Sequence, residues 1–299
     1  MSIASTFLQL RIKVELVAAG EALDRYRAVA RRHARALPPT QRLLHDFAAE
    51  LSAYVRALTA CELDVADGVI ERCSALAEQS QVQAVALGVE LMQAGRALGD
   101  GRLDDVLARV QRLREGSSLA GGFALAWVSY ALRVVEAQSS LESLAGLIAK
   151  PPQGFEDLRP SQQIHGRVCL ARLNVKLGAP HKARALLATI PDEQLERMPV
   201  RYGDLGLMCY LAETYDALAD VPAAASLYEN LLPHAERNAV QLAFDYDGAV
   251  AHYLGILAAR LGERDLADKH FERGAAINRV LRMPLQAARS EALREKLHR

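Results

Sequence analysis

The stretch Gly248–Ile277, GAVAHYLGILAARLGERDLADKHFERGAAI, decides the fold. Two segments that favour helix, GAVAHYLGILAARLG and LADKHFERGAAI, lie on either side of the short break ERD. On the first helix, the large residue Leu254 stands next to Gly255, which has no side chain and leaves room for the second helix. Ala267 gives the second helix a small residue for a close crossing, and Phe271 follows about one turn later. The pattern predicts two antiparallel helices in close contact.

Similar pairs of helices are predicted upstream. Leu205–Leu232 and Ile164–Ile190 are clear copies, while Leu125–Ala149, Leu87–Leu113 and Phe47–Cys73 match less well. The crossing positions in successive copies are Ala22, Ala66, Val106, Leu144, Ala183, Ala224 and Ala267. Neighbouring positions are separated by 38 to 44 residues, which indicates an internal helical repeat.

This spacing resembles the tetratricopeptide hairpin, although a regular tetratricopeptide repeat has about 34 residues. We predict an all-α, right-handed superhelix of about seven helical hairpins with a period of about 40 residues, forming one domain over residues 1–299. The 52 Ala and 46 Leu among 299 residues favour helix and leave essentially no strand to be expected. The alternative is an irregular all-α bundle.

The predicted turns contain helix breakers or charged residues. Gly99-Asp100-Gly101, Gly178-Ala179-Pro180, Ala219–Pro222 and Gly262-Glu263-Arg264 separate the first helix of a pair from the second. Glycine suits the left-handed position after a helix, and proline suits the first turn of the next helix. The turn chemistry therefore agrees with the repeat.

Composition excludes several classes of partner. The chain has 36 Lys+Arg and 36 Asp+Glu, whereas a nucleic-acid binder that neutralises phosphates needs a basic excess. The longest stretch without a charged residue, Gly116–Leu132, contains Gly121-Gly122 and is too short in its helical part to cross a bilayer. The four cysteines form no CxxC pair and are typical of thiols in a reducing compartment. We expect a cytoplasmic protein with neither nucleic-acid nor membrane partners.

The last two copies resemble a known signalling element. LYENLLPHAERNAV (Leu227–Val240) and AHYLGILAARLGERDLADKHFERGAAINRVLRMP (Ala251–Pro284) are similar to the C-terminal helical-repeat arm of bacterial STAND-type ATPase signalling proteins, which often include a nucleotide cyclase or a LuxR-type DNA-binding domain. The resemblance covers residues 120–285 and rests on packing residues. It implies an arm that receives a signal by binding a partner or an inducer.

Catalytic motifs are missing from the sequence. It has no GxxxxGK[ST] phosphate loop, so no ATPase accompanies the arm, and the start at Met1 favours a free-standing relative over an excised arm. The eight histidines include no HExxH, and no GxSxG occurs. Asp245-Tyr246-Asp247 is expected to cap the last hairpin at its helix N-terminus, with a carboxylate pair for acid–base catalysis as the alternative. We predict no enzyme, no cofactor and no metal site.

The first helices of a superhelix line its concave groove, and such grooves bind extended segments. The predicted partner-binding residues on these helices are Arg133, Glu136, His165, Arg172, Lys176, Glu213, Asp216 and His252. The basic residues among them suggest a protein or peptide partner with an acidic group near the fourth and fifth hairpins. Two alternatives remain: an ordinary solvated helix face, and internal neutralisation by Glu213 and Asp216. A second function, a sensing arm that encloses a small-molecule inducer, stays open beside the protein-binding module.

Overall fold

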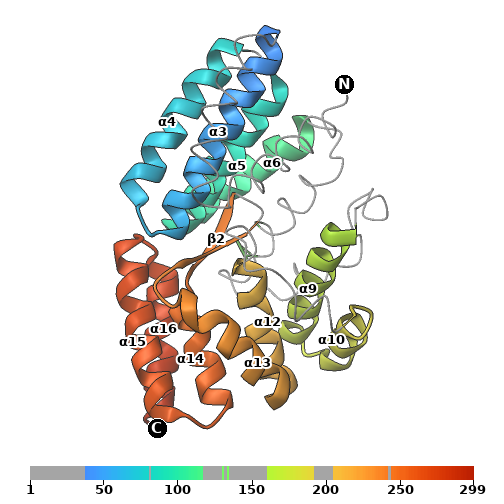
Figure 1. Ribbon diagram of the computed structural model, residues 1–299, viewed down its shortest axis with the longest axis vertical. Coiled ribbons are helices and arrows are strands. Elements are labelled where there is room, and N and C mark those ends of the chain that lie inside the picture. The colour runs from blue at the N-terminus through green and yellow to red at the C-terminus, as the bar shows by residue number, and fades with distance from the viewer. Residues whose placement is uncertain are drawn as a thin grey trace.

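The computed structural model describes residues 38–80, 82–116, 130, 133–134, 160–191, 205–241 and 244–299. These residues form a mainly helical fold with eleven α-helices and one short 3₁₀ helix, η1 (Leu232–His234) (Figure 1). The helical class predicted from the Ala- and Leu-rich composition is therefore confirmed for this part of the chain. One segment departs from it, as shown below.

Ten of the eleven helices form pairs joined by a tight turn. The pairs are α3 (Pro39–Thr59) with α4 (Leu63–Ser80), α5 (Gln83–Gly99) with α6 (Leu103–Gly116), α9 (Pro160–Lys176) with α10 (Pro180–Leu187), α12 (Leu205–Leu218) with α13 (Val221–Leu231), and α14 (Val250–Arg260) with α15 (Arg264–Val280). The eleventh helix, α16 (Pro284–Leu297), packs on α15.

Every turn between consecutive helices of these pairs, and the turn into α16, contains a residue with positive φ. These residues are Cys61, Gly101, Gly178, Ala219, Gly262 and Arg282. The left-handed conformation turns the chain back, and the N–H of Gly262, for example, donates to the carbonyl of Ala259 at 3.2 Å. The predicted glycine turns are thus confirmed at Gly101, Gly178 and Gly262. Ala219 takes the same conformation with a Cβ, at a cost of about 1–2 kcal/mol.

The crossing residues predicted from the repeat occupy one structural position. The fourth residue of the second helix, fully buried in each of the five pairs, is Ala66, Val106, Ala183, Ala224 and Ala267. Each of these N–H groups donates to the carbonyl of the residue before its helix, as Ala267 does to Glu263 at 2.9 Å. Ala22 and Leu144 lie outside the described residues. The predicted register therefore holds within these pairs.

Enlarging a crossing residue should overpack its pair of helices. We expect Ala224→Leu and Ala267→Leu each to lower the free energy of unfolding by about 1–3 kcal/mol, because the second helix must move away from its partner. Ser226→Leu and Lys269→Leu, on exposed positions two residues further along the same helices, are the matched controls and should change it by less than about 0.5 kcal/mol. Urea denaturation measures all four variants. Equal losses at the crossing and control positions would contradict the register.

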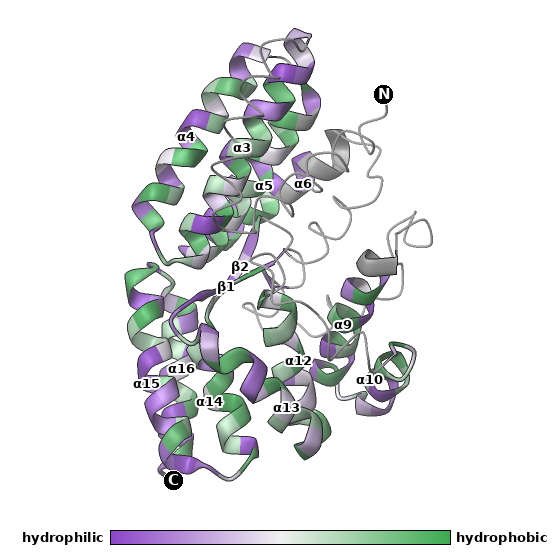
Figure 2. Cartoon of the chain, viewed as in Figure 1, coloured by the Kyte–Doolittle hydropathy of each residue, from purple (hydrophilic) through white to green (hydrophobic). Residues whose placement is uncertain are grey.

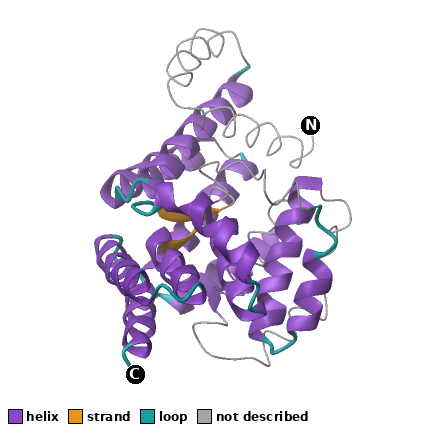
Figure 3. Cartoon of the chain, turned by 60° about the horizontal axis from the view of Figure 1, so that its bottom comes forward, coloured by secondary structure: helices purple, strands orange, loops and turns teal. Residues whose placement is uncertain are grey.

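A two-stranded antiparallel sheet interrupts the helices. It consists of β1 (Asn238–Gln241) and β2 (Asp245–Ala249), with Val240 opposite Tyr246 and an irregularity between Asn238 and Val240. All residues of both strands are buried, and Figure 3 shows the strands lying among the helices. The expectation of essentially no strand was therefore wrong for this segment.

The Asp245-Tyr246-Asp247 triplet is strand and not a helix cap. Helix α14 begins at Val250, and its N-cap residue Ala249 has extended backbone without a side-chain cap. The Ala249 N–H instead donates to Oδ1 of Asn278 on α15 at 2.8 Å. The predicted capping role was wrong because the triplet ends too early to reach the first turn of α14. Its side chains are available for other contacts.

The sheet lies where two hydrophobic clusters meet. The first cluster joins α3–α6 with Val240 and Tyr246 of the sheet, and the second joins α9–α15 with Ala239. On α5, a Cβ added to Gly99 would lie 2.5 Å from the Tyr246 hydroxyl, so a larger residue would push the sheet away. Figure 1 shows α3–α6 on one side of the strands and α12–α16 on the other. Figure 2 shows α12 and α14 mostly in hydrophobic colours, as expected for central helices.

Candidate functional site

Six of the predicted groove residues lie on the first helix of a described pair. His165, Arg172 and Lys176 lie on α9, and Arg172 and Lys176 are four residues apart on one face. Glu213 and Asp216 lie on α12, and His252 lies on α14. Arg133 is described although most of its chain neighbours are not, and Glu136 lies outside the described residues.

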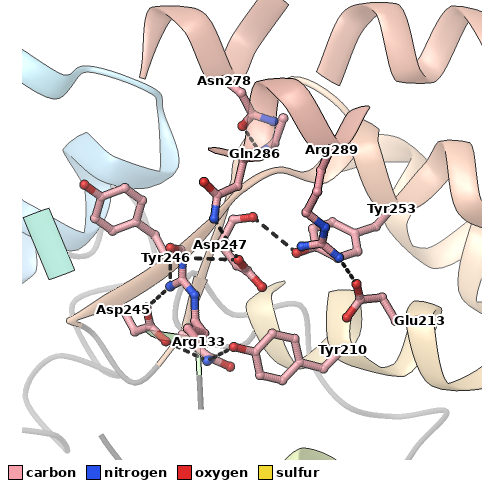
Figure 4. Close-up of polar contacts among 12 residues, drawn as sticks. Arg133, Tyr210, Glu213, Asp245, Tyr246, Asp247, Tyr253, Asn278, Gln286 and Arg289 are labelled. Carbon is pink, nitrogen blue, oxygen red and sulfur yellow. Dashed lines mark hydrogen bonds and ion pairs between the residues drawn. The ribbon is translucent and has the colours of Figure 1, made fainter. Parts of the chain in front are cut away.

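Arg133 is buried against the acidic residues of the sheet. Its guanidinium donates to Oδ1 of Asp245, donates to the carbonyl of Tyr246 at 2.6 Å, and lies 3.2 Å from Oδ1 of Asp247 (Figure 4). The Arg133 side chain is 4% exposed, and the Asp245 side chain is fully buried. Burial alone would lower the pKa of Arg133, but Asp245 and Asp247 more than offset this effect and keep it charged.

Neutral side chains hold the carboxylate of Asp245 and the backbone of Asp247 in place. The Gln241 amide donates to Oδ2 of Asp245 at 2.9 Å and to the Tyr210 hydroxyl oxygen at 2.8 Å. The Tyr253 hydroxyl donates to the Asp247 carbonyl at 3.2 Å. Helices α12 and α14 thus fix the strand that carries the acids. Hydrogen bonds of this kind are necessary where charges leave water.

Glu213 connects three cations from two other helices. Arg172 of α9 donates to Oε2 of Glu213, Lys176 lies 3.6 Å from Oε1, and Arg289 of α16 donates to Oε1. Burial alone would raise the pKa of Glu213, but Arg172 and the other two cations hold it well below its usual value. Arg172 also lies 4.1 Å from the centroid of the Tyr210 ring and 3.7 Å from Oδ2 of Asp247.

These contacts form a charged cluster that runs from the interior to the surface. We call the set Arg133, Arg172, Glu213, Asp245, Asp247 and Arg289 the ionic ladder. Lys176 lies 3.6 Å from Glu213 of the ladder, and Asp216, three residues after Glu213 on α12, pairs with Arg260 at 2.9 Å. We call Lys176, Asp216 and Arg260 the rim. Lys176 is 26% exposed and Arg289 37%, whereas Arg172 is 4% exposed. Solvent therefore reaches the ladder from the rim.

His252 lies beside the ladder as a neutral side chain. Its Nδ1 atom is 2.9 Å from the Ser290 hydroxyl of α16, and its Nε2 atom is buried without a hydrogen-bond partner. Burial, followed by the positive charge of Arg289, lowers the pKa of His252 to about 3. His165 is also buried, at 3% exposure. Neither histidine faces solvent as an exposed groove residue would.

Of the acids in the ladder, Glu213 was predicted as a groove residue, whereas Asp245 and Asp247 were not. Internal neutralisation by Glu213 was one of the alternatives, and the contacts of Arg172 with Glu213 agree with that alternative. Asp245 and Asp247 were assigned to a helix cap, and Arg289 was not considered. The density of acids in Asp245-Tyr246-Asp247 was the available signal. Nothing in its spacing indicated Arg133, which lies more than a hundred residues away, as its partner.

The described residues give no sign of a metal or membrane site. Among them, no group of three or more His, Cys, Asp or Glu side chains is placed to hold a metal ion. Within the same ranges, no helix is long and apolar enough to cross a bilayer. Comparisons with models of protein families, with curated proteins and with solved structures found no match to this chain. Interpretation of the site therefore depends on its geometry.

Proposed function

We propose that this chain is a non-catalytic binding module, a regulatory scaffold that holds a protein or peptide segment along its first helices. In this proposal the five described pairs belong to a right-handed superhelix of about seven tetratricopeptide-like hairpins with a period of about 40 residues. The observation that carries the proposal is the ionic ladder. Charged side chains of α9 and α16 pair with Glu213 of α12, and Arg260 of α14 pairs with Asp216 of α12, at a rim that solvent reaches.

The rim suits a segment with an acidic group. Lys176 and Arg260 of the rim, together with Arg289 of the ladder, present three cations, each between a quarter and two fifths exposed. An incoming carboxylate can contact them without disturbing the buried pair of Arg133 and Asp245. Partly desolvated Arg and Lys side chains bind carboxylates more strongly than fully exposed ones do. The proposal includes a cytoplasmic location and no nucleic-acid or membrane partner.

The test uses defined acidic peptides. A library of extended peptides with one or two Glu or Asp residues, and the same peptides with Gln or Asn, is screened by fluorescence anisotropy at about 0.1 M salt. We expect binding that depends on the acid and weakens about tenfold in the Lys176→Ala/Arg260→Ala variant, which corresponds to about 1.4 kcal/mol. Lys269→Ala, an exposed cation on the second helix α15, is the matched control and should bind normally. Equal binding of acid and amide peptides would refute the proposal.

A sensing arm that encloses a small inducer is the second candidate. It is favoured by buried polar atoms without protein hydrogen bonds beside the ladder, Nε2 of His252 and Oε1 of Gln286 among them. The resemblance to the arms of STAND-type signalling proteins, which implies an arm that binds a partner or an inducer, also favours this candidate. A thermal-shift screen against small polar metabolites distinguishes the two functions. A metabolite that raises the melting temperature, together with no peptide binding, would favour the sensor.

A further inference from the structure

Helix α16 covers part of the ladder with a polar inner face. Ser290 and Ala287 are its buried residues, in contrast to α14, where every residue from Val250 to Ala258 is buried. Leu293 and Leu297 of α16 are partly buried against the second hydrophobic cluster. Because little apolar area is removed from water at α16, its attachment depends strongly on polar contacts.

The polar contacts of α16 are incompletely satisfied. Arg289 donates to Glu213, Ser290 contacts His252, and Gln286 approaches Oδ1 of Asp247 at 3.5 Å, which is long for a hydrogen bond. Nε2 of His252, Oε1 of Gln286 and Nδ2 of Asn278 are buried along this seam without partners. Figure 4 shows Gln286, Asn278 and Arg289 around Asp247 and Glu213. Each unpartnered atom disfavours the closed seam, because water would hydrate it if the seam opened.

The two ends of α16 are attached differently. At its start, Leu281 and Met283 are fully buried and Pro284 opens the helix. At its far end, Leu293 and Leu297 are only partly buried, and the ion pairs of Arg294 and His298 with Asp268 are partly exposed to solvent. Exposed ion pairs contribute little, about 0–1 kcal/mol each. The helix can therefore lift at its far end while its start stays anchored.

We propose that α16 is a proton-sensitive lid, which opens locally at its far end and uncovers Glu213 and His252 of the ladder. The lid regulates access to the surface that the proposed function assigns to a partner, and this consequence rests on the proposed function. The opening of α16 does not depend on the proposed function. Elements that move during binding are drawn from the least stable parts of a fold, and α16 has the weak attachment that such an element needs.

Proton sensitivity follows from the surroundings of His252. The charged groups that face it are Arg289 of α16, Glu213 of α12, Asp247 of β2 and Lys176 of α9. Burial, followed by the charge of Arg289, lowers its pKa from 6.5 to about 3 in the closed state. An open lid hydrates the ring and separates it from Arg289, so the pKa returns toward 6.5. Below pH 6.5 the open state binds a proton that the closed state does not, and acid favours opening.

The other groups around His252 do not oppose this effect above about pH 5. Burial alone would raise the pKa values of Glu213 and Asp247, but the neighbouring arginines lower them in the closed state, and in an open state both return toward the usual value of a carboxyl group. Both carboxylates therefore stay ionised in either state at pH 5.5, and Lys176 and Arg289 stay protonated. Between pH 7.5 and 5.5, His252 is the group in this seam whose protonation differs between the closed and open lid.

Hydrogen exchange of the full chain tests the lid. Amide exchange in α16, corrected for intrinsic rates, is measured by mass spectrometry at pH 7.5 and 5.5, with α14 and α15 as internal references. We expect the open fraction of α16 to rise about tenfold at the lower pH while α14 and α15 change little. In His252→Gln the tenfold rise should disappear. In Arg289→Ala, exchange of α16 should increase at both pH values and the pH dependence should remain.

His298→Gln is the matched control. His298 also connects α16 to α15, through Asp268 at 2.7 Å, but neither residue is among the charged groups that face His252, so its removal should not abolish the rise. Three results would overturn the proposal: α16 exchange in wild type that is unchanged by pH, a tenfold rise that persists in His252→Gln, or parallel increases in α14, α15 and α16. None of these measurements uses a ligand, so they stand apart from the peptide test of the proposed function.

Discussion

Replacing Arg133 by methionine should lower the free energy of unfolding by about 3–5 kcal/mol, because Asp245 and Asp247 then lose their shared buried cation. Methionine keeps much of the side-chain volume, so the loss reports on charge more than on packing. Urea denaturation at pH 7.5 measures it. The deficit should shrink at acid pH, because burial raises the pKa of Asp247 once Arg133 no longer lowers it, and the carboxyl then takes up a proton more readily.

A control variant and a triple variant test whether unpaired buried charges cause the loss of stability. Arg260→Met breaks an ion pair with Asp216, which is 40% exposed, and should cost less than about 1 kcal/mol. Arg133→Met/Asp245→Asn/Asp247→Asn removes all three charges, and we expect it to regain most of the stability lost by Arg133→Met. A loss no larger than that of Arg260→Met, or no regain in the triple variant, would show that the buried end of the ladder is not an ionic unit.

The helical pairs were predictable because their signals are local. Ala224 and Ala267 are each followed four residues later by an aromatic side chain on the same helix. Helix periodicity, small crossing residues and glycine turns are all patterns that span about 30 residues or fewer, so they can be recognised within a single pair of helices. The predicted register holds at every crossing residue that the structure describes.

The β-hairpin was not predictable on the same basis. NAVQ and DYDGA lack the strict alternation of apolar and polar residues that marks a half-buried strand, since both faces are buried here. Their burial depends on contacts far away in sequence, such as Gly99 of α5 against Tyr246. Ala- and Leu-rich surroundings then favoured a prediction of helix throughout.

Helical periodicity predicts which groove residues share a helix face, but it does not predict which side chains form ion pairs. Helical periodicity puts Arg172 and Lys176 on one face, and it puts Glu213 on the facing side of the next first helix. It gives no information on whether a carboxylate from the same chain reaches them. Asp245 and Asp247 come from a segment with no helical period, so their contacts with Arg133 required the three-dimensional structure.

Replacing Phe271 by alanine should cost about 3–5 kcal/mol of unfolding free energy, through a cavity at the crossing of α14 and α15. Phe271 is 2% exposed, and a Cβ added to Gly255 of α14 would lie 2.6 Å from its ring. Gly255 therefore leaves the space that the ring fills. The His252 ring lies edge-on to Phe271 at 5.8 Å, so the cavity also removes one wall around His252.

Tyr228 is the matched control, because it occupies the equivalent position four residues after Ala224. It is partly exposed, and its hydroxyl contacts Nε2 of His270 at 3.0 Å, so Tyr228→Ala should cost clearly less than Phe271→Ala. Both variants are compared with wild type by urea denaturation at pH 7.5.

Adding Gly255→Ala to Phe271→Ala fills part of the cavity, and we expect the double variant to be more stable than Phe271→Ala alone. In wild type the same Gly255→Ala should destabilise, because the added methyl group meets the ring. A change of sign between the two backgrounds would demonstrate direct contact between residues 255 and 271, whereas equal effects in both would show that the close crossing at Gly255 is wrong.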